Sequence, residues 1–131
     1  PSPIQPDKEA TDRDFNAGIQ WCVENLDRVA FCAGSHNEAS NALLAKCLED
    51  AGIPADDPRA WSAQLLGMSD HISFNLSQSG LNVAKYVPFG PIRETIPYLI
   101  RRAEENSSVA GQTSRELELI RREVQRRKQL A

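Results

Sequence analysis

Residues 86–106 read YVPFGPIRETIPYLIRRAEEN and say more about the fold than any other part of the chain. A β-branched stretch at residues 83–87 enters this run and is predicted to be a strand that stops at the Pro/Gly-rich turn after it. An amphipathic helix is predicted over residues 91–106, and Pro97 within it predicts a kink or a displaced start. The run therefore reads as a short strand, a turn and a helix.

Adjacent arginines, Arg101 and Arg102, lie well inside the predicted helix. Two guanidinium groups at that place lose side-chain entropy and need partners. A bound carboxylate would be one, because the planar guanidinium fork matches two oxygens. On an ideal helix adjacent residues diverge by about 100°, so the pair reaches one ligand only if the two long side chains converge. The alternative is a solvated basic face, which is the usual place of an Arg-Arg pair on a helix.

The overall composition is that of a globular protein. Of the 131 residues, 40% are hydrophobic and 25% are charged, the net charge is −3 and the isoelectric point is about 5.4. The net charge therefore gives no long-range electrostatic attraction to nucleic acid or to an anionic membrane. No apolar run approaches the roughly 20 residues of a membrane span, and no leader precedes a cleavage site. Because the chain begins at Pro1 rather than Met, we expect a longer precursor or a cut chain.

Cysteine and histidine give no metal-ligand spacing in the sequence. Cys22, Cys32 and Cys47 form no CxxC pair, and the only histidines are His36 and His71. We interpret the cysteines as small buried hydrophobic residues in a reducing compartment. No metal is expected.

Helices and strands alternate along the rest of the chain. Two helices have apolar residues at steps of three and four, which predicts one buried face on each: Phe15, Ile19, Cys22, Val23 and Leu26 on the first, and Leu43, Leu44, Cys47 and Leu48 on the second. Helices are predicted at residues 8–26, from a cap at Asn37 to residue 51 with Gly52 as its stop, at residues 71–79 with Gly80 as its stop, at residues 91–106, and from a cap at Thr113 or Ser114 to residue 130. Strands are predicted at residues 29–33, 64–68 and 83–87.

This order is a helix, three strand–helix pairs and an extra helix, and it predicts an α/β fold with parallel strands and right-handed crossovers. Three strands cannot close a barrel. A (β/α)8 barrel takes about 250 residues, and the chain has close to half that length.

The run at residues 86–106 resembles the last strand and last helix of the proline dehydrogenase barrel, and the resemblance extends over roughly residues 3–128. Residues 64–68, Gln-Leu-Leu-Gly-Met, resemble the seventh strand of that family. The resemblance implies that the chain is the C-terminal portion of a (β/α)8 barrel, completed by an N-terminal part that is missing or is a separate chain. Residues 1–112 would belong to the barrel, and residues 113–131 would form a charged helix packed on it.

The resemblance also implies a binding site for the substrate carboxylate. Arg101 and Arg102 match paired arginines that grip the carboxylate, and Tyr98 matches a tyrosine with a supporting role. Tyr86 would pack over the small apolar substrate or the flavin, and Leu65 would supply an apolar wall near it. The alternatives are a buried structural tyrosine for Tyr86 and ordinary barrel core for Leu65.

A second implied site is for FAD. Ser35-His36-Asn37 is similar to the family motif Ala-Thr/Ser-His-Asn, which places Ser35, His36 and Asn37 against the cofactor, with Glu105 as a further contact. A hydroxyl, an imidazole and the exposed N–H groups of a helix start can hold phosphate or ribose oxygens. The alternatives are a plain capping turn with a surface histidine, and a Glu105 that orients one of the arginines. No catalytic acid or base is assigned in this chain.

By resemblance, the complete enzyme oxidises L-proline to Δ1-pyrroline-5-carboxylate and passes electrons through FAD to a quinone. It would be the monofunctional form, active only with its N-terminal half. It would be cytoplasmic if bacterial, with peripheral contact at the inner membrane, or mitochondrial if eukaryotic. In the final helix, a narrow apolar stripe at Leu117, Ile120 and Val124 favours docking on the barrel, whereas the basic charge would suit a membrane surface.

Three other functions are open on the sequence alone. The first is a hydroxyproline dehydrogenase, since a ring substituent leaves the carboxylate clamp intact. The second is a different barrel enzyme that binds a carboxylated or phosphorylated substrate without flavin. The third is a non-enzymatic helical adaptor, which predicts an all-α fold and no strand at residues 83–87.

Overall fold

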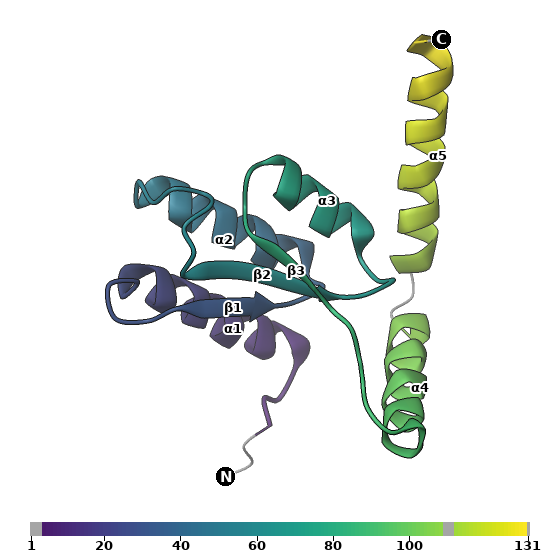
Figure 1. Ribbon diagram of the computed structural model, residues 1–131, viewed down its shortest axis with the longest axis horizontal. Coiled ribbons are helices and arrows are strands. Elements are labelled where there is room, and N and C mark those ends of the chain that lie inside the picture. The colour runs from purple at the N-terminus through teal and green to yellow at the C-terminus, as the bar shows by residue number, and fades with distance from the viewer. Residues whose placement is uncertain (1–3, 109–111, 131) are drawn as a thin grey trace. The chain divides into compact units, whose positions relative to one another are not determined.

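The computed structural model describes residues 4–108 and 112–130. The chain divides into two units, a sheet unit (Pro1–Tyr86) and a helical unit (Val87–Ala131). The boundary expected between residues 112 and 113 concerns the complete barrel and stays a prediction. The elements follow in the order α1 (Lys8–Glu24), β1 (Phe31–Gly34), α2 (Glu38–Asp50), β2 (Ala60–Leu65), α3 (Asp70–Gln78), β3 (Val83–Tyr86), α4 (Ile92–Ser108) and α5 (Gln112–Leu130) (Figure 1).

The sheet unit holds three parallel strands in the order β1-β2-β3. The strand arrows in Figure 1 point the same way, and a helix connects each strand to the next. The register places Ala33 opposite Ser62, and Gln64 opposite Lys85. Parallel strands with helical crossovers are βαβ units, so the predicted α/β fold is confirmed. The adaptor alternative, which required no strand at residues 83–87, is wrong.

The two faces of the sheet differ in burial because successive strand residues point to opposite sides. Along β2, Ala60, Ser62 and Gln64 face the helices and are buried, while Trp61 between them is 39% exposed. Cys32 pairs in register with Trp61 and is exposed on the same face. The prediction of buried cysteines is therefore wrong for Cys32, which lies on the face that α1, α2 and α3 leave uncovered.

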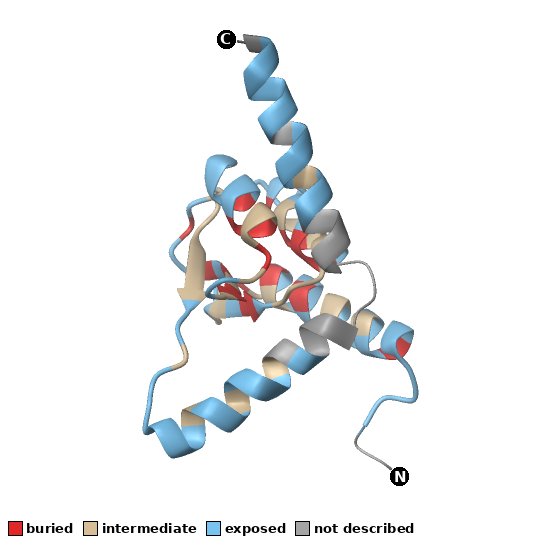
Figure 2. Ribbon diagram, turned by 90° about the vertical axis from the view of Figure 1, so that its right-hand side faces the viewer, coloured by how far each residue is buried: buried red, intermediate tan, exposed pale blue. Residues whose placement is uncertain are grey.

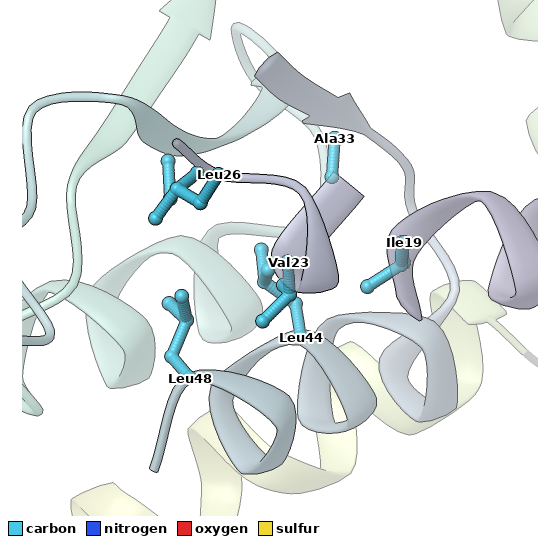
Figure 3. Packing of buried hydrophobic residues seen from close by; sticks show 7 residues of the cluster. Ile19, Val23, Leu26, Ala33, Leu44 and Leu48 are labelled. Carbon is cyan, nitrogen blue, oxygen red and sulfur yellow. The ribbon is translucent and has the colours of Figure 1, made fainter. Parts of the chain in front are cut away.

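The core lies between α1, α2 and the helix-facing side of the sheet. Ile19 and Val23 come from α1, Leu44 and Leu48 from α2, and Ala33 from β1, and Figure 3 shows them pointing toward one another. Burying a side chain such as leucine stabilises a fold by about 1.5–3 kcal/mol. Figure 2 shows the buried positions of the sheet unit gathered where its helices meet its strands. The apolar faces predicted for the first two helices are confirmed.

The predicted ends of α2 are also confirmed. The side-chain oxygen of Asn37 accepts a hydrogen bond from the backbone N–H of Ala39 at 2.9 Å, which satisfies one of the donors that a helix start leaves unpaired. Gly52 follows the helix with φ of +64°, a left-handed conformation that favours glycine.

The second strand is not where the hydrophobic pattern predicts it. β2 runs over Ala60–Leu65, and residues 66–68 form a turn, so the predicted strand exists but its predicted bounds, residues 64–68, are wrong. Ser62 and Gln64 explain the error. Both are buried polar residues that face the helices and are hydrogen-bonded there, and the strand consequently lacks the apolar run typical of a parallel sheet.

The start predicted for α4 is confirmed to within one residue, whereas the cap predicted for α5 is wrong. α4 begins at Ile92 and continues through Pro97, so the proline does not displace its start. α5 begins at Gln112. Thr113 and Ser114 therefore lie in its first turn and do not cap it from outside.

An ion pair between Asp57 and Arg59 stabilises the segment that leads into β2. Arg59 Nε donates to Asp57 Oδ1 at 2.9 Å and its Nη2 donates to Oδ2 at 2.7 Å. The side-chain and backbone hydrogen bonds from Arg59 hold the pKa of Asp57 at about 2. Arg59 Nη1 also donates to the carbonyl of Leu26 at 3.2 Å, which ties the connector before β2 to the segment after α1.

This geometry predicts how stability depends on pH. Because the pKa of Asp57 lies below its ordinary value of 3.8, the stabilisation is complete above pH 3.8 and is lost as the pH falls towards 2. We expect Asp57→Asn to lower the free energy of unfolding at neutral pH and the difference from wild type to shrink on acidification, as measured by urea unfolding. Asp56→Asn, at the exposed neighbouring carboxylate, is the control. A difference for Asp57→Asn that stays constant with pH would contradict the assignment.

Candidate functional site

The carboxyl ends of the three strands meet at one edge of the sheet. A recess of about 330 Å³ opens there, lined by Gly34, Ser35, His36, Ala63, Gln64, Leu65 and Tyr86. Ligand pockets typically measure about 300–1,000 Å³. The structure thus brings together four residues singled out in the sequence, Ser35, His36, Leu65 and Tyr86.

The turn after β1 is built by local hydrogen bonds. The backbone N–H of Ser35 donates to the carbonyl of Ala63 at 3.1 Å, which extends the ladder between β1 and β2. Ser35 Oγ accepts from the N–H of Asn37 at 3.0 Å, which leaves its own hydrogen to donate to a ligand. Asn37 caps α2 with its oxygen. The capping role assigned to Asn37 is confirmed, and a ligand would meet this turn mainly through Ser35 and His36.

His36 is held at both ring nitrogens. Its Nδ1 lies 2.8 Å from Ser69 Oγ, and its Nε2 accepts from the backbone N–H of Leu65 at 3.4 Å. Because Nε2 accepts, the hydrogen is assigned to Nδ1, which donates to Ser69. Burial lowers the pKa of His36, and the positive charge of Lys85 lowers it further. His36 is therefore a neutral imidazole at pH 7, and it is not the loose surface histidine of the alternative interpretation.

Ser69 is a site residue that the sequence analysis missed. It is buried and has φ of +51°, a left-handed conformation unusual for a residue other than glycine. It precedes α3 without capping it by its side chain, and its hydroxyl meets His36. No sequence signal marks a left-handed serine.

Lys85 braces the same turn from β3. Its Nζ donates to the carbonyl of Met68 at 2.8 Å and forms an ion pair with Asp70 at 2.7 Å. Since Met68 and Asp70 flank Ser69, these contacts hold the backbone that presents the serine hydroxyl.

Leu65 and Tyr86 form the apolar wall of the recess. They pair in register at the ends of β2 and β3. Tyr86 is 56% exposed, so it is not a buried structural tyrosine within the sheet unit. A small apolar substrate or one edge of a flavin could lie against this wall while the polar groups of a nucleotide meet Ser35 and His36. The apolar wall and the polar turn of the recess both fit a flavin nucleotide.

The arginine pair belongs to the helical unit, where the two side chains have different surroundings. Arg101 is exposed, and Arg102 is half-buried. The guanidinium carbon of Arg102 lies 5.3 Å from the centre of the Tyr98 ring, one helical turn earlier, in a cation–π contact. Tyr98 and Arg102 are thus brought together as a pair. The side chain of Glu105 lies outside the described part of the structure.

Neither a metal-binding cluster nor a membrane-spanning helix occurs among residues 4–108 and 112–130. Within these ranges no three or more His, Cys, Asp or Glu side chains gather in a way that could hold a metal ion. No helix described there is both long and apolar enough to cross a membrane.

Comparisons with known proteins show similarity to the proline dehydrogenase family. The family model described as proline dehydrogenase matches residues 1–115. Bovine (Bos taurus) "Proline dehydrogenase 1, mitochondrial" is 42% identical over 95% of this chain and 22% of its own length. Bovine "Hydroxyproline dehydrogenase" is 43% identical over 95% of this chain and 28% of its own length. "Carbapenem antibiotics biosynthesis protein CarD" of Pectobacterium carotovorum subsp. carotovorum is 39% identical over 92% of this chain and 31% of its own length.

A solved structure shares the fold. Proline utilization A (PutA) from Bdellovibrio bacteriovorus, inactivated by N-propargylglycine, superposes with a TM-score of 0.75 at 25% identity, over 84% of this chain and 11% of that one. The three parallel strands and their helices correspond to part of the proline dehydrogenase barrel, which confirms the predicted fold class. The chain spans less than a third of the length of these curated relatives.

The environment of His36 predicts a second pH effect. Because its pKa lies below the ordinary value of 6.5, the unfolded state takes up the proton first, and stability is lost as the pH falls below about 6.5. We expect His36→Gln to reduce the loss of unfolding free energy between pH 7 and pH 5, measured by urea unfolding. His71→Gln, which replaces the other histidine, should leave the contribution of His36 in place. An equal pH dependence in His36→Gln and wild type would contradict the assignment.

Proposed function

Because this chain belongs to the proline dehydrogenase family, we propose that it forms the C-terminal part of the barrel in an enzyme that oxidises L-proline to Δ1-pyrroline-5-carboxylate, with FAD as cofactor and a quinone as electron acceptor. The observation that carries the proposal is the recess at the carboxyl ends of the strands, where Ser35, His36, Leu65 and Tyr86 converge. Barrel enzymes keep their chemistry at this end of the strands.

Ser35 and His36 are the residues of the sheet unit proposed to hold FAD, with Asn37 contributing through its backbone at the start of α2. The first N–H groups of a helix favour phosphate oxygens, and the hydroxyl of Ser35 has a hydrogen to donate. The neutral ring of His36 adds no charge to the site. Glu105 is the contact proposed from the helical unit. When bound, FAD supplies the hydride acceptor, and the protein supplies binding and orientation.

Arg101 and Arg102 are proposed to bind the substrate carboxylate. The stacking of Arg102 on Tyr98 supports this role because it restricts the plane of one guanidinium before substrate arrives. Tyr86 and Leu65 are proposed to cover the apolar ring of proline. Held at its carboxylate and its ring, the substrate would present one edge to the cofactor, which is a positioning effect.

The remaining partners follow from the barrel. The N-terminal part of the enzyme supplies the other strands, and residues 113–131 form a charged helix packed on the barrel. Leu117, Ile120 and Val124 are exposed within the helical unit and offer the stripe for this packing. Basic residues of the same helix are proposed to contact a membrane surface peripherally. This contact would bring the enzyme close to its quinone acceptor. The enzyme is mitochondrial in a eukaryote and cytoplasmic, at the inner membrane, in a bacterium.

The carboxylate clamp can be tested in the complete enzyme. Arg101→Met or Arg102→Met should raise the KM for L-proline about thirtyfold or more, because removing one member of a desolvated charge pair costs about 2–5 kcal/mol. The FAD content should stay near that of wild type. Arg93→Met, at an exposed arginine near the start of α4, is the matched control and should leave KM unchanged. Unchanged KM in both clamp variants would refute the clamp.

The visible spectrum tests the function as a whole. The complete purified enzyme should show flavin absorption that bleaches when L-proline is added without oxygen. A folded, colourless protein that ignores L-proline would remove the proposal, and it would favour a barrel enzyme that binds its substrate without flavin.

A hydroxyproline dehydrogenase is the second candidate, because those relatives are as similar as the proline dehydrogenases, at 43% against 42% identity. The wall formed by Leu65 and Tyr86 is mainly apolar, and an apolar pocket rejects an added hydroxyl by about a hundredfold at most. We expect kcat/KM to favour L-proline over trans-4-hydroxy-L-proline by about ten- to a hundredfold. A ratio below one would reverse the assignment.

A further inference from the structure

A chain of buried polar side chains crosses the sheet unit beneath the recess. Ser73 of α3 donates to Gln64 Oε1 at 2.8 Å, and Gln64 Nε2 donates to Ser62 Oγ at 2.8 Å. Ser62 donates in turn to Asn41 Oδ1 of α2 at 2.6 Å. All four residues are 4% exposed or less. The chain therefore links α3, β2 and α2 by side-chain hydrogen bonds in a place where apolar packing is the rule.

This chain ends on the turn after β1. Asn41 Nδ2 donates to the carbonyl of Ser35 at 3.1 Å and to the carbonyl of Asn37 at 2.8 Å. Gln64 Nε2 adds a longer bond to the carbonyl of Ser35 at 3.3 Å. The carbonyls of Ser35 and Asn37, on either side of His36, are thus held by hydrogen bonds from Asn41 and Gln64. Ser69 holds the imidazole of His36.

Stability alone does not account for this arrangement. A buried polar side chain stabilises little beyond an apolar one of the same size, and it is costly when a partner is lost. The helix start does not need it either, because Asn37 already caps α2. What the amide of Asn41 adds is geometry, since its two donors fix the spacing of the carbonyls of Ser35 and Asn37.

We propose that Asn41 is a positioning residue that holds the Ser35–Asn37 turn in the geometry that binds the flavin nucleotide, with Gln64 and Ser62 fixing the orientation of its amide. The inference rests on the proposed function, because it takes FAD as the ligand of this turn. Asn41 itself does not touch the cofactor and acts through the turn.

The test compares two truncations in α2 of the complete enzyme. Asn41 and Leu48 are each 3% exposed and lie on the same helix, so Asn41→Ala and Leu48→Ala both remove buried side-chain atoms. Asn41→Ala should raise the Kd for FAD, measured by fluorescence titration of the flavin-free enzyme, about tenfold or more, as expected from one or two lost hydrogen bonds. Leu48→Ala should lower the melting temperature and leave this Kd within twofold of wild type. Equal FAD affinity in Asn41→Ala and wild type would overturn the inference.

Amide hydrogen exchange of the flavin-free enzyme gives a second measurement that needs no cofactor. Exchange at residues 35–37 should be faster in Asn41→Ala than in Leu48→Ala. Equal rates would contradict the proposal that Asn41 holds the turn. If Asn41→Ala does not fold, Asn41→Leu keeps the branched shape of the side chain without the two donors and should show the same changes. A wild-type enzyme that binds no FAD would sink the proposed function instead, and the exchange rates would still decide whether Asn41 holds the turn.

Discussion

Parallel pairing of β2 with both of its neighbours is the constraint on which the other features depend. Because each strand returns through a helix, the three carboxyl ends arrive at one edge of the sheet. The turn at Ser35 and His36 and the wall of Leu65 and Tyr86 are brought together there, although Ser35 and Tyr86 are 51 residues apart in the sequence. The same pairing aligns Ser62 and Gln64 on the helix-facing side of the sheet, where they reach α2 and α3.

The features that could be predicted from the sequence are those that depend on the spacing of apolar residues and on helix-capping residues. The core faces of α1 and α2, the cap at Asn37 and the stop at Gly52 all follow from local rules. The predicted position of β2 was wrong for a physical reason, since two of its buried side chains, Ser62 and Gln64, are polar and form hydrogen bonds with each other and with Asn41 and Ser73 of the neighbouring helices. The left-handed Ser69 is set by tertiary contacts and leaves no local signal. The importance of the arginine pair came from family resemblance, because Arg-Arg alone is typical of a solvated helix face.

The turn after β1 is restrained from two directions. Asn41 holds its carbonyls, and Ser69 holds the imidazole of His36. The two restraints come from different parts of the fold, since Asn41 lies in α2 and Ser69 lies in the turn before α3. Two independent restraints on one turn suit its proposed role in binding a cofactor, which requires a fixed geometry. The two arginines of α4 differ in how far they are restrained. Arg102 is held by Tyr98, whereas Arg101 is exposed within the helical unit.

β1 and β3 are the outer strands of the described sheet, so each presents a row of backbone donors and acceptors along an edge. In a closed barrel both rows would be covered by further strands, and some of these pairs would join segments far apart in sequence. Such contacts form slowly because of loop-closure entropy. Any form in which one edge is still open would expose backbone groups that can pair with another protein, and chaperones would matter most at that stage.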